Sequence, residues 1–145
     1  MPYNFPSAEW VQAYARALDE SAEYAQAART WTHGAIALAV RPEPALGLPD
    51  GFAVWLDVDS GRCRGARAVG RAEAETAPFC ITASYERWRA VLTSRLDPIA
   101  GMVTRRLELR GSLVTMMRYV RSAKAMVRCA AAIPSVFLEA REVVA

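Results

Sequence analysis

The sequence predicts an α+β fold, a mixed or antiparallel sheet of about five strands covered on one face by helices. Helical periodicity and strand alternation occur in separate stretches of the chain. Each predicted strand also places its bulkier apolar side chains on one face, which is typical of a sheet packed against helices on that side. The 145 residues contain no low-complexity linker, so we expect a single domain over 1–145.

The first elements expected are two helices. Ser7 is a favourable N-cap residue, and apolar side chains recur at helical spacing from Trp10 to Leu18. This pattern predicts a helix over 8–18. A weak break at 19–21 separates it from a second helical segment over 22–30.

Alternation predicts five strands, at about 31–40, 52–58, 62–70, 79–83 and 107–110. The second and third strands are joined by Asp59-Ser60-Gly61, a typical hairpin turn. The first two strands present large residues on one face: Ile36, Leu38, Val40, Phe52, Val54, Leu56 and Val58. Their other face carries Ala35, Ala37, Ala39, Ala53 and Trp55.

A last helical region begins after Gly111-Ser112 and has no further Pro until Pro134. We expect it to break once, near Ser122. Its apolar stripe consists of Leu113, Met116, Met117, Val120 and Val127, with Tyr119 and Met126 at its edge. By itself such a stripe indicates a helix packed on the hydrophobic core.

The stretch from Tyr85 to Gly111 carries a family resemblance. A short helix with a Trp runs into an Arg-Leu-Asp-Pro break, and a second helix and a brief strand follow. The matching positions are Trp88, Leu92, Ser94, Arg95, Leu96, Asp97, Pro98, Ala100, Leu107, Leu109 and Gly111. This order resembles the sterol carrier protein 2 family of non-specific lipid-transfer domains, over about residues 8–132. Ser94 stands where the family more often has glycine.

The resemblance implies a carrier of an apolar lipid: a fatty acyl chain, an acyl-CoA, a sterol-like molecule or an isoprenoid. The lipid would lie in a cavity between the sheet and the C-terminal helices, where flexible Met side chains can repack around it. The implied lining is Ile36, Leu38, Phe52, Val54, Leu56, Leu113, Met116, Met117, Val120, Met126 and Val127. The alternative is an accessory or dimerising subunit that presents lipid to an enzyme, as in isoprenoid-quinone biosynthesis.

Catalytic and metal-binding patterns are missing from the sequence. His33 is the only histidine, and no G-x-S-x-G, Walker or Cys-x-x-Cys motif is present. Asp57 and Asp59 begin like a calcium loop, but its other ligand positions are wrong. We therefore expect a protein that is not an enzyme, without catalytic residues, metal or cofactor.

Positive charge is concentrated in residues 61–128, which hold 14 basic and 5 acidic side chains. A solvated surface explains this most simply. Contact with anionic head groups or an anionic membrane is the other interpretation, with Arg105, Arg106, Arg118 and Arg121 as candidates. The basic stretches lack the interleaved aromatic residues of single-strand nucleic-acid platforms, so we expect no nucleic-acid partner.

Two further expectations concern location and assembly. The odd number of cysteines and the lack of a signal-like start or a bilayer-length apolar run favour the cytoplasm. The alanine-rich face of the sheet needs cover, because exposed apolar patches of this kind are unfavourable. Either residues 133–145, with Ile133, Val136, Phe137 and Leu138, or a second copy in a homodimer could cover it.

Overall fold

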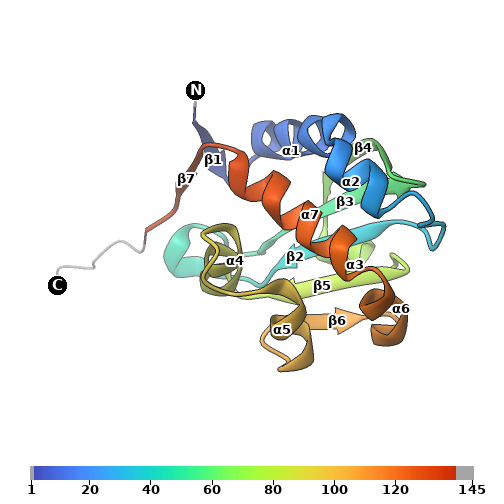
Figure 1. Cartoon of the computed structure of the whole chain (residues 1–145). Helices are drawn as coiled ribbons and strands as arrows, with labels where there is room; N and C mark the ends of the chain where they lie inside the picture. Colours follow the sequence, from blue (N-terminus) through green and yellow to red (C-terminus); the bar gives the residue numbers. More distant parts are fainter. Residues whose placement is uncertain (1, 140–145) are drawn as a thin grey trace, which may run out of the picture.

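The computed structural model describes residues 2–139. Its centre is a five-stranded mixed sheet in the order β4-β3-β2-β5-β6, and most helices lie on one face of that sheet (Figure 1). β2 and β5 are parallel, and the other neighbouring pairs are antiparallel. The α+β fold class predicted from the sequence is confirmed.

The first half of the chain contains β1 (Tyr3–Phe5), α1 (Ala8–Glu20), α2 (Ala22–Ala27), β2 (Ile36–Val40), the 3-10 turn η1 (Pro44–Leu46), β3 (Phe52–Asp59) and β4 (Arg62–Val69). The second half contains α3 (Arg71–Ala74), β5 (Phe79–Ala83), α4 (Tyr85–Leu92), α5 (Pro98–Val103), β6 (Glu108–Arg110), α6 (Leu113–Arg118), α7 (Val120–Ala132) and β7 (Ser135–Phe137).

Side-chain caps begin most of the longer helices. Ser7 Oγ accepts a hydrogen bond from the Trp10 amide at the start of α1, and Asp97 accepts one from Ala100 at the start of α5. Ser21, Ser84 and Ser112 play the same part for α2, α4 and α6. Each cap satisfies an amide that the helix itself leaves unpaired, so the helix starts follow from local sequence.

The strand predicted over 31–40 begins only at Ile36. Gly34 adopts a left-handed conformation with φ of +96°, which interrupts an extended chain. The indole of Trp31 turns inward, is 2% exposed, and donates its Nε1–H to the Gly34 carbonyl at 2.9 Å. Residues 31–35 therefore form a loop, with Trp31 buried and Thr32 and His33 exposed, instead of a strand.

The single break predicted near Ser122 in the last helical region lies at Tyr119, between α6 and α7. Tyr119 has φ of −116° and ψ of 37°, outside the helical range, and it ends α6 and precedes α7. Its hydroxyl donates to the backbone carbonyl of Thr30 at 3.0 Å. A contact across 89 residues of sequence thus accompanies the break.

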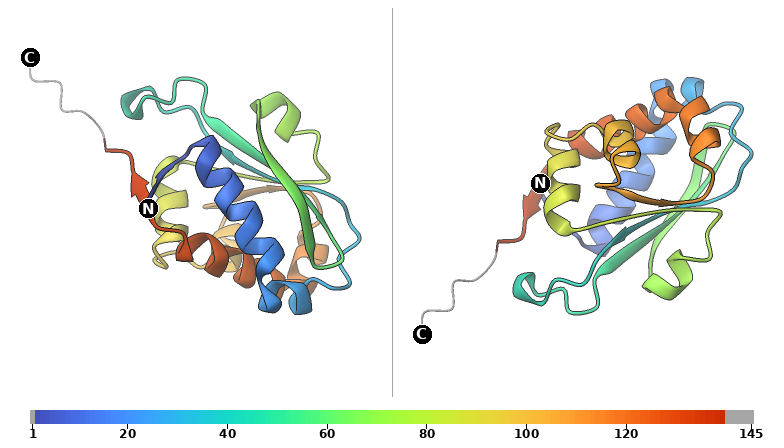
Figure 2. Two further views of the ribbon diagram at one scale, coloured as in Figure 1. Left: turned by 90° about the horizontal axis from the view of Figure 1, so that it is seen from above. Right: turned by 90° about the horizontal axis from the view of Figure 1, so that it is seen from below.

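The alanine-rich face of the sheet is covered by α3 and the turn after it. Figure 2 shows α3 on the side of the sheet away from α1 and α7. The packed cluster on this face is Ala37, Ala39, Ala53, Ala74, Ala77 and Cys80, with Trp55 and Val69 at its edge. The prediction that the C-terminal residues cover this face is therefore wrong.

The C-terminal residues lie instead on the helical side. β7 pairs in parallel with β1 to form a separate two-stranded sheet, and Ile133 belongs to the main core. Residues 140–145 of the predicted cover lie outside the described residues. The homodimer stays a prediction, but the alanine-rich face no longer requires it.

Candidate functional site

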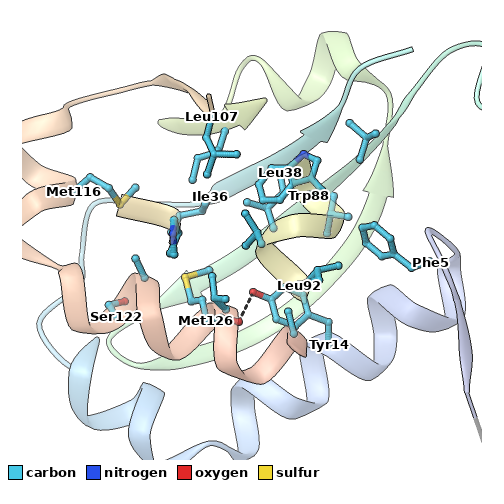
Figure 3. Close-up of a pocket in the computed structure, with 18 of the residues that line it drawn as sticks. Phe5, Tyr14, Ile36, Leu38, Trp88, Leu92, Leu107, Met116, Ser122 and Met126 are labelled. Carbon is cyan, nitrogen blue, oxygen red and sulfur yellow. Dashed lines mark hydrogen bonds between the residues drawn. The ribbon is translucent and has the colours of Figure 1, made fainter. Parts of the chain in front are cut away.

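An apolar pocket lies between the large-residue face of the sheet and helices α1, α4, α6 and α7, with a volume of about 80 Å³ (Figure 3). Its floor comes from alternate residues of three neighbouring strands: Ile36, Leu38 and Val40 of β2, Phe52 and Val54 of β3, and Ile81 of β5. The strand alternation that predicts one large-residue face therefore also accounts for the floor of this pocket.

Four of the five predicted sheet residues line the pocket: Ile36, Leu38, Phe52 and Val54. The fifth, Leu56, is fully buried in the core but lies outside the lining. It is paired with Ile36 across the sheet, beside the region where α1 packs against β4. Leu56 is therefore packed in the core beside the pocket. A residue on the pocket-facing side of a strand does not always line the pocket.

The predicted helical stripe is only partly in the lining. Met116, Met126 and Val127 line the pocket. Leu113 and Met117 do not, because their side chains are 41% and 44% exposed. Val120, in the first turn of α7, is half-buried and also outside the lining. The break at Tyr119 sets α6 and α7 on separate axes, so one helical period does not run through both.

Several lining residues were missed by the sequence analysis, and many of them are aromatic: Phe5, Trp10, Tyr14, Trp31, Trp88 and Tyr119. Trp10 and Tyr14 are four residues apart on the inward face of α1, and Trp88 and Leu92 have the same spacing on α4. Helical spacing could therefore have indicated these two pairs. Phe5 and Leu107 carried no such signal, since only the tertiary fold brings them to the pocket.

The polar atoms of the lining aromatics are already paired within the protein. Tyr14 donates its hydroxyl to the Met126 carbonyl at 3.1 Å, and Trp88 donates its Nε1–H to the Ala39 carbonyl at 2.8 Å. The partners of Trp10, Trp31 and Tyr119 are Ser135 Oγ, the Gly34 carbonyl and the Thr30 carbonyl. Burial raises the pKa of Tyr14 well above its usual value, so this phenol is neutral. The pocket lining contains no charged side chain.

Side chains with other chemistry lie outside this lining. Cys63, Cys80 and Cys129 are free thiols, and burial raises the pKa of Cys63 and Cys80. His33 is exposed, and its ring lies 5.0 Å from the Trp31 ring between centroids. Among residues 2–139, no group of three or more His, Cys, Asp or Glu side chains is placed to hold a metal ion.

Three of the four candidate arginines lie in the segments just before and after the edge strand β6, and the fourth lies on α7 (Figure 1). Arg105 and Arg106 lie in the connection from α5 to β6, Arg118 ends α6, and Arg121 lies in the first turn of α7. All four are exposed, and none forms an ion pair within the described part of the chain. Nearby on α6, Leu113, Val114 and Met117 are exposed apolar side chains.

Comparison with known proteins identifies the family of this fold. The model of the SCP-2 sterol transfer family matches residues 13–124. The chain belongs to the SCP-2 sterol transfer family. The family resemblance seen in the sequence is thereby confirmed, and the family is one of lipid-binding and lipid-transfer domains.

Two solved structures of SCP-2 proteins are closely similar to the structure of this chain. A crystal structure of sterol carrier protein 2 is 43% identical, with a TM-score of 0.82 over 88% of this chain and 97% of that one. A protein of Thermus thermophilus, described as possibly a sterol carrier protein, is 42% identical, with a TM-score of 0.80 over 90% of each chain.

A more distant SCP-2 structure is a ubiquinone synthesis protein, UbiJ-SCP2. It is 14% identical, with a TM-score of 0.53 over 87% of this chain and 95% of that one, so this likeness concerns the fold alone. Among curated protein sequences, none matches the chain.

None of the helices within residues 2–139 combines the length and the apolarity needed to cross a bilayer.

Proposed function

We propose that this SCP-2 protein binds and carries an apolar lipid in the pocket between the sheet and helices α6 and α7. The observation that carries the proposal is a pocket lined by aliphatic and aromatic side chains, with no charged group. Transfer of a lipid chain from water into such a lining releases roughly 0.8 kcal/mol per buried CH₂. A fatty acyl chain, the acyl part of an acyl-CoA, a sterol-like molecule or an isoprenoid would each satisfy this requirement.

Binding a whole lipid requires the pocket to expand. Its volume of about 80 Å³ is small beside the ~300–1,000 Å³ of pockets that enclose drug-sized ligands. Of the six residues in α6, only Met116 is buried, so an outward shift of this helix would expose little core surface. Met116 and Met126 can also change rotamer around ligands of different shape.

A carrier must exchange its lipid with a membrane or a partner. The exposed arginines Arg105, Arg106, Arg118 and Arg121, with the apolar outer surface of α6, suit contact with an anionic membrane. Free thiols at all three cysteines fit a reducing compartment such as the cytoplasm. The alternative, a subunit that presents lipid to an enzyme, would use the same pocket.

Two neighbouring methionines give a matched test of the pocket. Met116 lines it and is 3% exposed, whereas Met117 is 44% exposed and outside it. Because an unpaired charge is costly in an apolar pocket, Met116→Arg should weaken binding of a fluorescent fatty acid about tenfold or more. Met117→Arg should leave it nearly unchanged. Titration of the two folded variants measures this, and mass spectrometry of the wild-type protein can identify co-purified lipid.

Equal affinity in both variants would place the lipid elsewhere. Consistent failure of the wild-type protein to bind any apolar probe would contradict the carrier function itself.

A further inference from the structure

One polar side chain in the pocket has no partner within the protein. Ser122 is 4% exposed, and aromatic and cysteine residues aside, it is the one polar or charged residue among residues 2–139 that is buried. Its hydroxyl makes no hydrogen bond within that part of the chain, whereas the Tyr and Trp groups of the lining are all paired. The hydroxyl is not fully sealed within the protein, and Ser122 is one of the residues that line the pocket.

A serine in a helix usually returns its hydroxyl to the carbonyl four residues earlier. Thr93 and Thr104, at the C-terminal ends of α4 and α5, make such bonds with Arg89 and Ala100. Ser122 makes none, because the carbonyl four residues earlier is that of Arg118, which lies in α6 before the break at Tyr119. An unpaired hydroxyl in apolar surroundings is unfavourable, and alanine would fill the position without that cost. The hydroxyl therefore suggests a hydrogen-bonding partner that enters with the ligand.

The position of Ser122 in its helix narrows the chemistry of that partner. Ser122 lies in the first turn of the 13-residue helix α7, whose N-cap residue Tyr119 supplies no side-chain cap. The positive end of the helix dipole favours an electron-rich oxygen there. With no charged side chain in the lining, an ionised head group would be poorly compensated. A neutral hydroxyl or carbonyl group has an electron-rich oxygen and carries no charge that the lining would have to compensate.

The two ends of the pocket differ, which gives the ligand a direction. Figure 3 shows Ser122 and Met116 at one end and Phe5 at the other, with Leu38 and Trp88 between them. The ring of Phe5 lies 4.7 Å from that of Trp10 and 5.7 Å from that of Tyr85, and the polar atoms of Trp10 and Tyr85 are paired within the protein, so this end offers no free polar side-chain group. An apolar tail would be well accommodated there.

We propose that Ser122 is the polar anchor of the pocket. It selects single-chain lipids that end in one neutral hydroxyl or carbonyl group and directs their tails toward Phe5. This inference rests on the proposed carrier function and adds the class of lipid and its orientation.

The anchor can be tested with two probes of equal length, dodecanol and dodecane, titrated into wild-type protein, Ser122→Ala and Ser122→Thr. Loss of one hydrogen bond should weaken dodecanol binding by about three- to tenfold in Ser122→Ala. Ser122→Thr, which keeps a hydroxyl, should restore it, and dodecane should bind all three proteins alike. The ionised dodecanoate should bind the wild type less tightly than dodecanol.

Equal loss of both probes in Ser122→Ala would assign a merely structural role to Ser122 and overturn the proposal. So would equal dodecanol binding by all three proteins, although the carrier function would stand. If neither probe bound any of the proteins, the carrier function would fail first. Denaturation curves check the folding of each variant.

The direction of the bound lipid chain in the pocket can be measured separately. Dodecanol brominated at its far carbon should quench Trp10, at the Phe5 end, more than Trp31, whose ring lies 4.9 Å from that of Tyr119. With each variant saturated with the brominated probe, the fraction of fluorescence quenched should therefore persist in Trp31→Phe and decrease in Trp10→Phe. The reverse pattern would overturn the proposed direction of the chain.

Discussion

Gly61 illustrates how one residue can control the approach of two elements. It follows Ser60 in the turn between β3 and β4, and both residues have positive φ, 51° for Ser60 and 82° for Gly61. A Cβ atom on Gly61 would lie 2.4 Å from the backbone carbonyl oxygen of Ala25 in α2. The turn therefore needs glycine both for its conformation and for the contact with α2.

Gly61→Ala should lower the free energy of unfolding by about 2 kcal/mol or more, because left-handed strain adds to a backbone clash. Gly65→Ala is the matched control on β4, since an added Cβ meets nothing within 4 Å there. Its effect should stay within about 0.5 kcal/mol. Urea denaturation measures both, and equal stability of the two variants would contradict this account of the turn.

Among the helices, α6 has an unusual distribution of apolar residues. One of its residues, Met116, is buried at 3% exposure, while Val114 is 68% exposed. The helix lies between Gly111, with φ of +128°, and the non-helical Tyr119. Its inner side thus contacts the pocket through one flexible side chain, and its outer side carries exposed apolar side chains.

The double change Arg118→Gln/Arg121→Gln should weaken binding to anionic vesicles on the order of tenfold, since each basic residue near such a surface contributes about 1 kcal/mol. Wild-type binding should need anionic lipid and decrease as salt rises. Arg64→Gln/Arg67→Gln removes the same charge from β4 and should have a smaller effect. Vesicle sedimentation at low and high salt measures this. Equal binding to neutral vesicles would leave these arginines as ordinary surface residues.

For the whole molecule, an occupied pocket should stabilise the fold. A ligand that binds only the folded state at about 100 times its Kd adds about 2.7 kcal/mol to the free energy of unfolding. For a chain of this size that corresponds to a rise in Tm of roughly 5–10 °C. Calorimetry with and without dodecanol should show the rise in the wild type and a smaller one in Met116→Arg. An unchanged wild-type Tm despite measured binding would mean that the ligand also binds the unfolded chain.

Local sequence determined much of this protein. Alternation identified the face of β2 and β3 that carries Ile36, Leu38, Phe52 and Val54, because successive strand residues point to opposite sides. Ser7 at the start of α1 was read as an N-cap, because its hydroxyl can pair an amide a few residues away. The passage around Trp88 indicated the family. These signals depend on residues close together in the chain.

Only the tertiary structure decided the position of the helix break, the cover of the alanine-rich face and the full lining of the pocket. The break at Tyr119 accompanies a bond to Thr30, and the cover of the alanine-rich face comes from α3 instead of the C-terminal residues. The pocket brings Phe5 together with Leu107, and the unpaired hydroxyl of Ser122 is recognisable only once its neighbours are in place. Contacts between residues far apart in sequence depend on how whole elements pack, and neither helical nor strand periodicity encodes that packing.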